Sequence, residues 1–278
     1  MHACQPSDIS VLKLDLEHTL KVAHDWFVAN SLKLNPKKTD ILLTKARQRK
    51  TPSFSIDFNG ITLVPSAKIK ILGVMIDAHL TWEAHVSQVV RRCYATLRGL
   101  SKFAHCLSYD VKKFLIEALV MPHIRYCITV WGGCGITQQK RVQKILNHCA
   151  RVVFSVRKSE HVSPLLRELQ WSSISTRVCE RDLLMLRHLL SHPYSPQCLS
   201  SKVRYRSSVS VRDTRAAVAG HLELPRVRTE MAKRFFDYRA LSLWNEALAN
   251  LKDTSSAAGF KREVEAWLEA RDHARHSK

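Results

Sequence analysis

Two segments decide the predicted fold: Asn30-Ser31-Leu32-Lys33-Leu34-Asn35-Pro36-Lys37-Lys38-Thr39 and Lys70-Ile71-Leu72-Gly73-Val74-Met75-Ile76-Asp77. Between them, Phe54, Ile56 and Phe58 alternate with polar residues, which is the period of a half-buried strand. Asn59-Gly60 then supplies the positive φ angles of a tight hairpin turn, and residues 61–64 form the returning strand. Residues 69–76 are predicted to form one more strand, in or beside the same sheet.

An amphipathic helix precedes this stretch, and Ser7 or Asp8 is predicted to cap it. Its apolar residues recur at steps of three and four and predict one buried stripe that ends near Asn30: Ile9, Leu12, Leu16, Leu20, Ala23 and Phe27. Residues 41–43 are predicted to form a short strand. Helix, basic turn, strands and hairpin together predict a compact α+β unit.

The remainder of the chain is predicted to be helical, so the predicted fold class is α+β and mostly helical. Thr81 is predicted to cap the first of these helices. Residues 191–229 have few apolar periods and many Ser and Arg residues, which indicates a long loop or linker. Helices are predicted over residues 81–104, 109–119, 137–154, 164–169, 177–190, 233–251 and 257–270, with a short helix or buried segment at 123–131.

The helical stripes also predict which side chains form the core. Each of the chosen positions lies on an apolar stripe or carries a large aromatic ring. Asp77 ends a predicted strand, and we expect it to accept hydrogen bonds within a turn. The side chains predicted to be mainly buried are Leu16, Leu20, Phe27, Val86, Cys93, Leu97, Ile145, Cys149 and Trp244.

Charge and composition restrict the class of partner. The 278 residues carry 44 Lys and Arg against 24 Asp and Glu, a net charge of +20, which favours nucleic acid. No apolar run of about 18 residues predicts a membrane span, and the first residues do not resemble a signal peptide. The eight cysteines are scattered without a CxxC pair, which indicates a reducing, intracellular compartment.

The order of residues from Trp26 to Asp77 resembles the end of the palm in reverse transcriptases of non-LTR retrotransposons of the LINE, jockey-like kind. The matching residues are Trp26, Leu34, Asn35, Lys38, Thr39, Asn59, Gly60, Leu72, Gly73, Val74 and Asp77. The resemblance implies that Lys38 lies near the incoming nucleotide, where it would assist catalysis by neutralising or protonating the pyrophosphate that leaves. It implies that Asn59, Gly60, Leu72, Gly73 and Val74 form the primer grip. Without the resemblance, Lys38 is a solvated loop lysine.

The same resemblance continues through a thumb and a C-terminal region. The matching residues are Tyr109, Pro122, Ile124, Tyr126, Trp131, residues 142–147 and Arg151, then Arg234, Phe236, Ala240, Leu243, Trp244, Asn245, Phe260 and Lys261. It implies a palm end at residues 1–80, a thumb-like region at 81–190, a basic loop or linker at 191–229 and a C-terminal helical region at 230–272. The Leu-Pro that follows Trp-Asn in the family is replaced here by Glu246-Ala247-Leu248.

The polymerase centre of this family needs aspartates that this sequence lacks. The expected "ADD" after an aromatic residue does not occur, although two-metal nucleotidyl transfer requires such carboxylates. We therefore expect a fragment of an RNA-directed DNA polymerase that is inactive alone, while Mg²⁺ serves the intact enzyme. The alternatives are a non-catalytic nucleic-acid-binding protein derived from such an element, and a decayed reading frame.

Two basic stripes are the candidate nucleic-acid-binding residues: Arg91, Arg98 and Lys102 on one helix, and Lys140, Lys144 and Arg151 on another. A charged helix face is commonly only a solvated surface. On helices that resemble a thumb, the stripes favour phosphate contacts with an RNA–DNA or DNA duplex, because such contacts position without reading sequence.

A zinc site is the other chemistry that the sequence raises. His123, Cys127 and Cys134 are close in sequence, but structural zinc sites usually show paired ligands at short spacing. Buried thiols explain the cysteines better. No metal ligand is therefore assigned in this chain.

Overall fold

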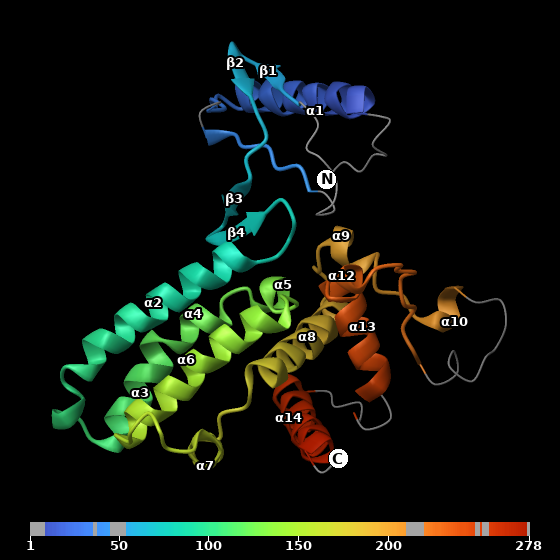
Figure 1. The fold of residues 1–278 in the computed structure, drawn as a ribbon. Helices are drawn as coiled ribbons and strands as arrows, with labels where there is room; N and C mark the ends of the chain where they lie inside the picture. Colours follow the sequence, from blue (N-terminus) through green and yellow to red (C-terminus); the bar gives the residue numbers. More distant parts are fainter. Residues whose placement is uncertain are drawn as a thin grey trace. The chain divides into compact units, whose positions relative to one another are not determined.

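A computed structural model of the chain describes residues 9–35, 38–44, 54–209, 220–247, 251 and 256–276. The chain divides into two compact units, Met1–His85 and Val86–Lys278. Helices dominate, and two small antiparallel hairpins complete the secondary structure of the described residues (Figure 1). The predicted α+β, mostly helical fold class is confirmed.

The first helix of the N-terminal unit, α1 (Ile9–Ala29), has the predicted extent but a different burial. None of its residues is fully buried, and Leu16, Leu20 and Phe27, predicted to be mainly buried, are only partly buried. The physical reason is the size of its partner, because α1 packs on β1 (Ile56–Phe58) of a small hairpin. Two strands of three residues each cannot cover a helix of 21 residues. The predicted caps, Ser7 and Asp8, lie outside the described residues.

The hairpin predicted at Asn59-Gly60 is confirmed. Strand β1 pairs antiparallel with β2 (Ile61–Leu63), and Phe58 lies opposite Ile61. Asn59 and Gly60 have φ angles of 50° and 76°, as a two-residue turn of this type requires. The strand predicted at residues 41–43 is wrong, because Ile41 forms only an isolated parallel bridge with Pro65.

The single strand predicted at residues 69–76 is also wrong. These residues form a second hairpin, in which β3 (Lys68–Ile71) pairs antiparallel with β4 (Val74–Asp77). The chain reverses at Leu72 and Gly73, whose φ angles are 45° and 87°. The prediction missed this turn because Lys70 to Ile76 is mostly apolar and looks like one strand. Gly73 is the second turn residue, where a tight hairpin with positive φ favours glycine. The two hairpins are separate two-stranded sheets.

Asp77 organises the turn that leads into the next helix, as predicted. Its Oδ1 accepts hydrogen bonds from the backbone N–H groups of His79 (3.2 Å) and Thr81 (3.0 Å), and its Oδ2 from that of Trp82 (2.9 Å). The Thr81 hydroxyl donates to Oδ2 and accepts the N–H of Glu83, the first residue of α2. One carboxylate therefore satisfies the donors of a whole turn.

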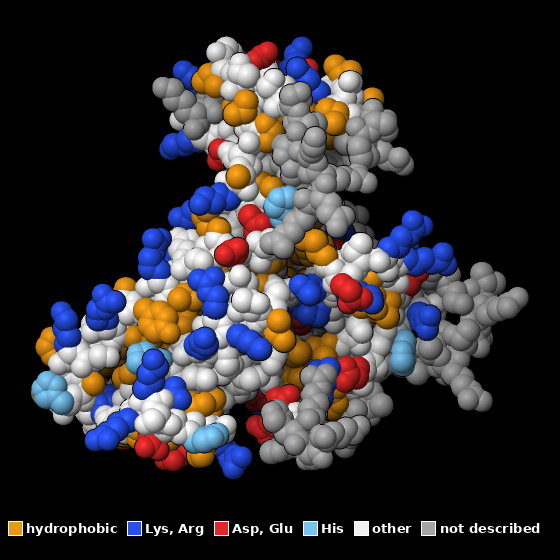
Figure 2. Space-filling model, viewed as in Figure 1, with side chains coloured by type: hydrophobic (Ala, Val, Ile, Leu, Met, Phe, Trp, Pro, Cys, Tyr) orange, Lys and Arg blue, Asp and Glu red, His pale blue; other side chains and the backbone are white. Residues whose placement is uncertain are grey.

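A helical bundle begins the second unit, and its core follows the predicted stripes. Val86, Cys93, Leu97, Ile145 and Cys149 are at most 1% exposed, which confirms the prediction for all five. The outward faces carry Lys and Arg side chains (Figure 2). The helices are α2 (Glu83–Ser101), α3 (Tyr109–Leu119), α4 (Met121–Arg125), α5 (Ile128–Trp131) and α6 (Ile136–Phe154), with a short 3-10 turn, Ala104–Cys106, before α3.

The stretch expected to be a loop at residues 191–229 has more structure than predicted. After α7 (Val162–Glu168) and α8 (Ile174–Ser191) come the short helices α9 (Gln197–Ser200) and α10 (Arg206–Val209). Leu222 is fully buried, and the Asn245 side chain accepts its N–H (2.8 Å) and donates to its carbonyl (2.9 Å). One distant amide thus replaces the regular partners of this backbone, which local periodicity cannot reveal.

The helix predicted at residues 233–251 is α13 (Phe236–Ala247), and the short helix α12 (Glu230–Lys233) precedes it. The final helix, α14 (Ala257–His276), extends beyond its predicted end at residue 270. Helices α8, α13 and α14 share an apolar core of Leu183, Leu243, Phe260, Val264 and Leu268. Trp244, predicted to be mainly buried, packs against this core and is partly buried.

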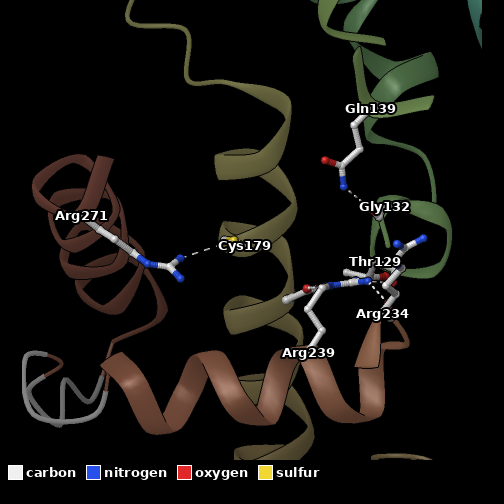
Figure 3. A network of polar contacts seen from close by, with 8 residues as sticks. Thr129, Gly132, Gln139, Cys179, Arg234, Arg239 and Arg271 are labelled. Atoms are coloured by element: carbon white, nitrogen blue, oxygen red, sulfur yellow. Dashed lines mark hydrogen bonds and ion pairs between the residues drawn. The ribbon is translucent and has the colours of Figure 1, made fainter. Parts of the chain in front are cut away.

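A buried ion pair joins α5, α8 and α13 (Figure 3). The Arg239 guanidinium donates to both carboxylate oxygens of Asp182 and to the Thr129 carbonyl, which is 3.0 Å away. It also donates to the Arg234 carbonyl. A Cβ at Gly133 would collide with that carbonyl and with Arg239, so the close approach requires glycine here. Burial raises the pKa of the Asp182 carboxyl, and Arg239 opposes that rise.

Leu97→Ala tests the bundle core. The change should destabilise the protein by about 2–5 kcal/mol, because it removes a fully buried leucine side chain. Denaturant titration measures the free energy of unfolding. Leu119→Ala, at a leucine that is 46% exposed, is the control and should cost much less. An effect of Leu97→Ala below ~0.5 kcal/mol would contradict the assigned core face.

Asp182→Asn tests the buried ion pair. The variant leaves the Arg239 charge without its partner, so we expect a loss of about 3–5 kcal/mol in the free energy of unfolding. Glu265→Gln, which breaks the exposed pair with Lys261, is the matched control and should cost less than about 1 kcal/mol. Equal effects of the two variants in the same titration would show that Asp182 is not a structural anchor.

Candidate nucleic-acid interface

The first basic stripe follows the solvent side of α2. Arg91, Arg98 and Lys102 are all exposed, and Arg92 beside them is exposed as well. None of these four forms an ion pair with a carboxylate among the described residues. The buried residues of α2 lie on its opposite side. The repeat of 3.6 residues per turn keeps these two sets of side chains on different faces of the helix.

The second stripe lies on α6, a helix of 19 residues that contains no Asp or Glu. Lys140 and Lys144 are exposed, whereas Arg151 is half-buried. Arg151 donates from Nε and Nη2 to the carbonyl of Glu160, at 3.3 and 3.0 Å. It therefore holds the segment after α6, and fewer of its donors remain available to a ligand.

Two side-chain contacts bring the stripes together. The ring of Tyr94 on α2 meets the ring of His148 on α6, with centroids 5.9 Å apart. Seven residues earlier on both helices, Arg141 donates to the Ser87 hydroxyl at 3.0 Å. The equal steps show that α2 and α6 run in the same direction along this seam. Residues three or four positions apart share a helix face, so the stripes flank the seam.

The flanking positions define one basic face. Arg91 and Arg98 lie at i−3 and i+4 from Tyr94, and Lys144 and Arg151 lie at i−4 and i+3 from His148. Figure 2 shows Lys and Arg side chains spread over the region of α2 and α6, with few Asp or Glu side chains among them. We call these four residues, with Lys102 and Lys140, the basic face.

His148 contributes a ring to this face rather than a charge. Partial burial lowers its pKa, and Arg151 and Lys158 lower it further, which disfavours the protonated imidazole. Sequence reasoning missed Tyr94 and His148. Their signal was present, because each lies within one helical turn of two predicted cations, but only the fold shows that the two rings meet.

The residues implied as primer grip lie in the two hairpins of the N-terminal unit. Asn59 and Gly60 are exposed in the turn of the first hairpin, and Leu72 and Gly73 form the turn of the second. Leu72 is 85% exposed at this tip, whereas Val74 is buried at 5%. The turns Asn59-Gly60 and Leu72-Gly73 are therefore open to solvent, whereas the buried Val74 side chain anchors the second hairpin.

Lys38 is exposed in the turn after α1. Its N–H donates to the Asn35 carbonyl at 3.0 Å, and the Thr39 hydroxyl donates to the same carbonyl at 3.1 Å. The motif residues Asn35, Lys38 and Thr39 thus build one local turn that leaves the lysine side chain in solvent. Pro36 and Lys37 lie outside the described residues.

The cysteines behave as thiols of the core and surface. Burial raises the pKa of Cys93 to about 12 and that of Cys134 to about 11. In the part of the chain that the structure describes, no three His, Cys, Asp or Glu side chains gather into a group that could hold a metal ion. No helix within the described ranges is long and apolar enough to cross a membrane.

Comparison with known proteins identifies relatives of one kind. The chain is 24% identical over 166 residues to a probable RNA-directed DNA polymerase from transposon BS of Drosophila melanogaster, which is 59% of this chain and 18% of the relative. It is 24% identical over 157 residues (54% and 17%) to the one from transposon X-element of the same species. It is 24% identical over 184 residues (65% and 20%) to the RNA-directed DNA polymerase from mobile element jockey of Drosophila funebris.

The predicted resemblance to reverse transcriptases of non-LTR retrotransposons is thereby confirmed. The matched residues span about a fifth of the length of these curated relatives. No family model and no solved structure matches the chain.

Proposed function

We propose that this chain is the nucleic-acid-gripping part of an RNA-directed DNA polymerase of a non-LTR retrotransposon, and that it binds an RNA–DNA or DNA duplex without reading its sequence. The observation that carries this is the basic face, where cations of α2 and α6 lie on both sides of one seam and form no ion pair with a carboxylate of the described residues. Phosphates are the ligands that such a face suits, because each neutralised phosphate releases counterions.

The similarity to polymerases supports different roles for successive regions of the chain. Residues 1–80 would be the end of the palm, with the turns at Asn59-Gly60 and Leu72-Gly73 as primer grip. Residues 81–190 would be the thumb, followed by a basic linker at 191–229 and a C-terminal region at 230–272. The basic face lies on helices of this thumb.

Catalysis by these residues alone is not part of the proposal. Two-metal nucleotidyl transfer needs carboxylates that hold Mg²⁺ ions. The sequence lacks the "ADD" motif, and the described residues offer no group of ligands. The donor set therefore does not fit the metals, and no step is assigned to them. Lys38 would assist nucleotidyl transfer only in an intact polymerase that contains the catalytic aspartates.

The salt dependence of binding tests the gripping function. If the basic face contacts about six phosphates, log K should fall against log salt with a slope near −5, from about −0.9 per phosphate. Replacing Arg91, Arg98 and Lys102 together by Gln should flatten the slope by up to ~3 units. Fluorescence anisotropy with a labelled duplex in rising salt measures both values.

A matched triple variant controls for net charge. Arg226, Arg228 and Arg262 are exposed and lie off the basic face, so replacing them by Gln removes the same charge from the protein. Their loss should change the slope much less. Equal slopes for the two triple variants would mean that overall charge, and not the basic face, binds the duplex. No binding at low salt would favour the decayed reading frame.

Primer extension tests the expectation that the chain alone does not catalyse nucleotidyl transfer. Purified chain, primed template, Mg²⁺ and four nucleotides should yield no product, because no carboxylate cage positions the metals that activate the 3′ hydroxyl. The measurement is product length on a denaturing gel. Magnesium-dependent extension that Lys38→Ala abolishes would overturn the proposal that this chain only grips nucleic acid.

A further inference from the structure

The seam of the basic face contains an exposed aromatic ring among its cations. Tyr94 is 39% exposed, although its neighbours at i−3 and i+4 are arginines on the solvent side of α2. A face that only follows a duplex backbone uses cations and hydrogen-bond donors, and the Tyr94 hydroxyl alone would serve that purpose. An accessible ring among such cations adds a surface on which a base can stack.

The spacing of the cations suits a strand that passes over this ring. Arg91 and Arg98 are seven residues apart, which is about 10 Å along a helix axis at 1.5 Å per residue. About three nucleotides of a stacked strand cover that length, since each adds 3.4 Å. Phosphates held by the two arginines would therefore leave a base between them at the level of Tyr94.

His148 completes the platform from the other helix. Its ring is tilted by 44° to that of Tyr94 and limits how the tyrosine can rotate. The two rings form an aromatic surface between the charged edges of α2 and α6. Inside a duplex the bases are already stacked and paired, whereas a base of an unpaired strand is free to stack on this surface.

We infer that Tyr94, supported by His148, stacks on an unpaired base, so that the basic face holds a single-stranded segment continuing from a duplex. This inference rests on the proposed gripping function and names the part of the nucleic acid that the seam contacts. Arg91 and Arg98 hold the phosphates on either side of the stacked base, and Lys144 holds the strand from the α6 side.

The test compares a blunt duplex with the same duplex carrying a short single-stranded extension. Wild-type protein should bind the extended duplex more tightly. Tyr94→Leu should weaken that binding by about fivefold to a hundredfold, the usual effect of losing one stacked base. Its affinity for the blunt duplex and its salt slope should not change, because no charge is removed. Tyr94→Phe keeps the ring and should bind like wild type.

Tyr194→Leu is the matched control. Tyr194 also meets a histidine, His192, with ring centroids 5.9 Å apart, and is 87% exposed, but it lies after α8 and away from the basic face. It should affect neither ligand. A Tyr94→Leu protein that melts like wild type and binds both ligands like wild type, or loses both equally, overturns the inference alone. Failure of the wild type to bind either ligand at low salt overturns the proposed function and this inference with it.

Discussion

The Asp182–Arg239 ion pair is the contact on which the arrangement of the second unit depends. Asp182 is fully buried on α8, and the several kcal/mol that desolvating its charge costs must be offset by a paired charge and hydrogen bonds. Arg239 meets that requirement from α13 while its remaining donors reach carbonyls near α5 and α12. We expect a charge pair of this kind to restrict the positions that these helices can take, since a shift would leave a buried charge unpaired.

The bundle of α2 to α6 uses a different means, the burial of apolar stripes. Val86, Cys93 and Leu97 on α2 face a core that Ile145 and Cys149 on α6 help to build. Because every buried residue lies on one side of each helix, the opposite sides are free to carry charge. The basic face is thus a consequence of the same periodicity that makes the core.

Periodicity is also what sequence reasoning reads well, and its failures have physical causes. The stripes on α2 and α6, the turn at Asn59-Gly60 and the role of Asp77 were all predictable, because each depends on nearby residues. The turn at Leu72-Gly73 was not, since an apolar run through a hairpin looks like one strand. The order around Leu222 depends on Asn245, which is 23 residues away. Likewise the contact of Tyr94 with His148 joins two helices whose separate patterns do not predict their alignment.

The basic face itself argues against a purely structural role for its charges. Lys140 and Lys144 are like charges at i and i+4, which destabilise a helix by ~0.2–0.5 kcal/mol per pair. No acidic residue of α6 offsets this repulsion, and Arg91 and Arg98 line the adjoining helix with the same sign. A solvated surface would be more stable with both signs interspersed, as on α14, where Lys261 pairs with Glu265. Polyanionic phosphates at this proposed interface would relieve the repulsion, so a bound nucleic acid would stabilise α2 and α6.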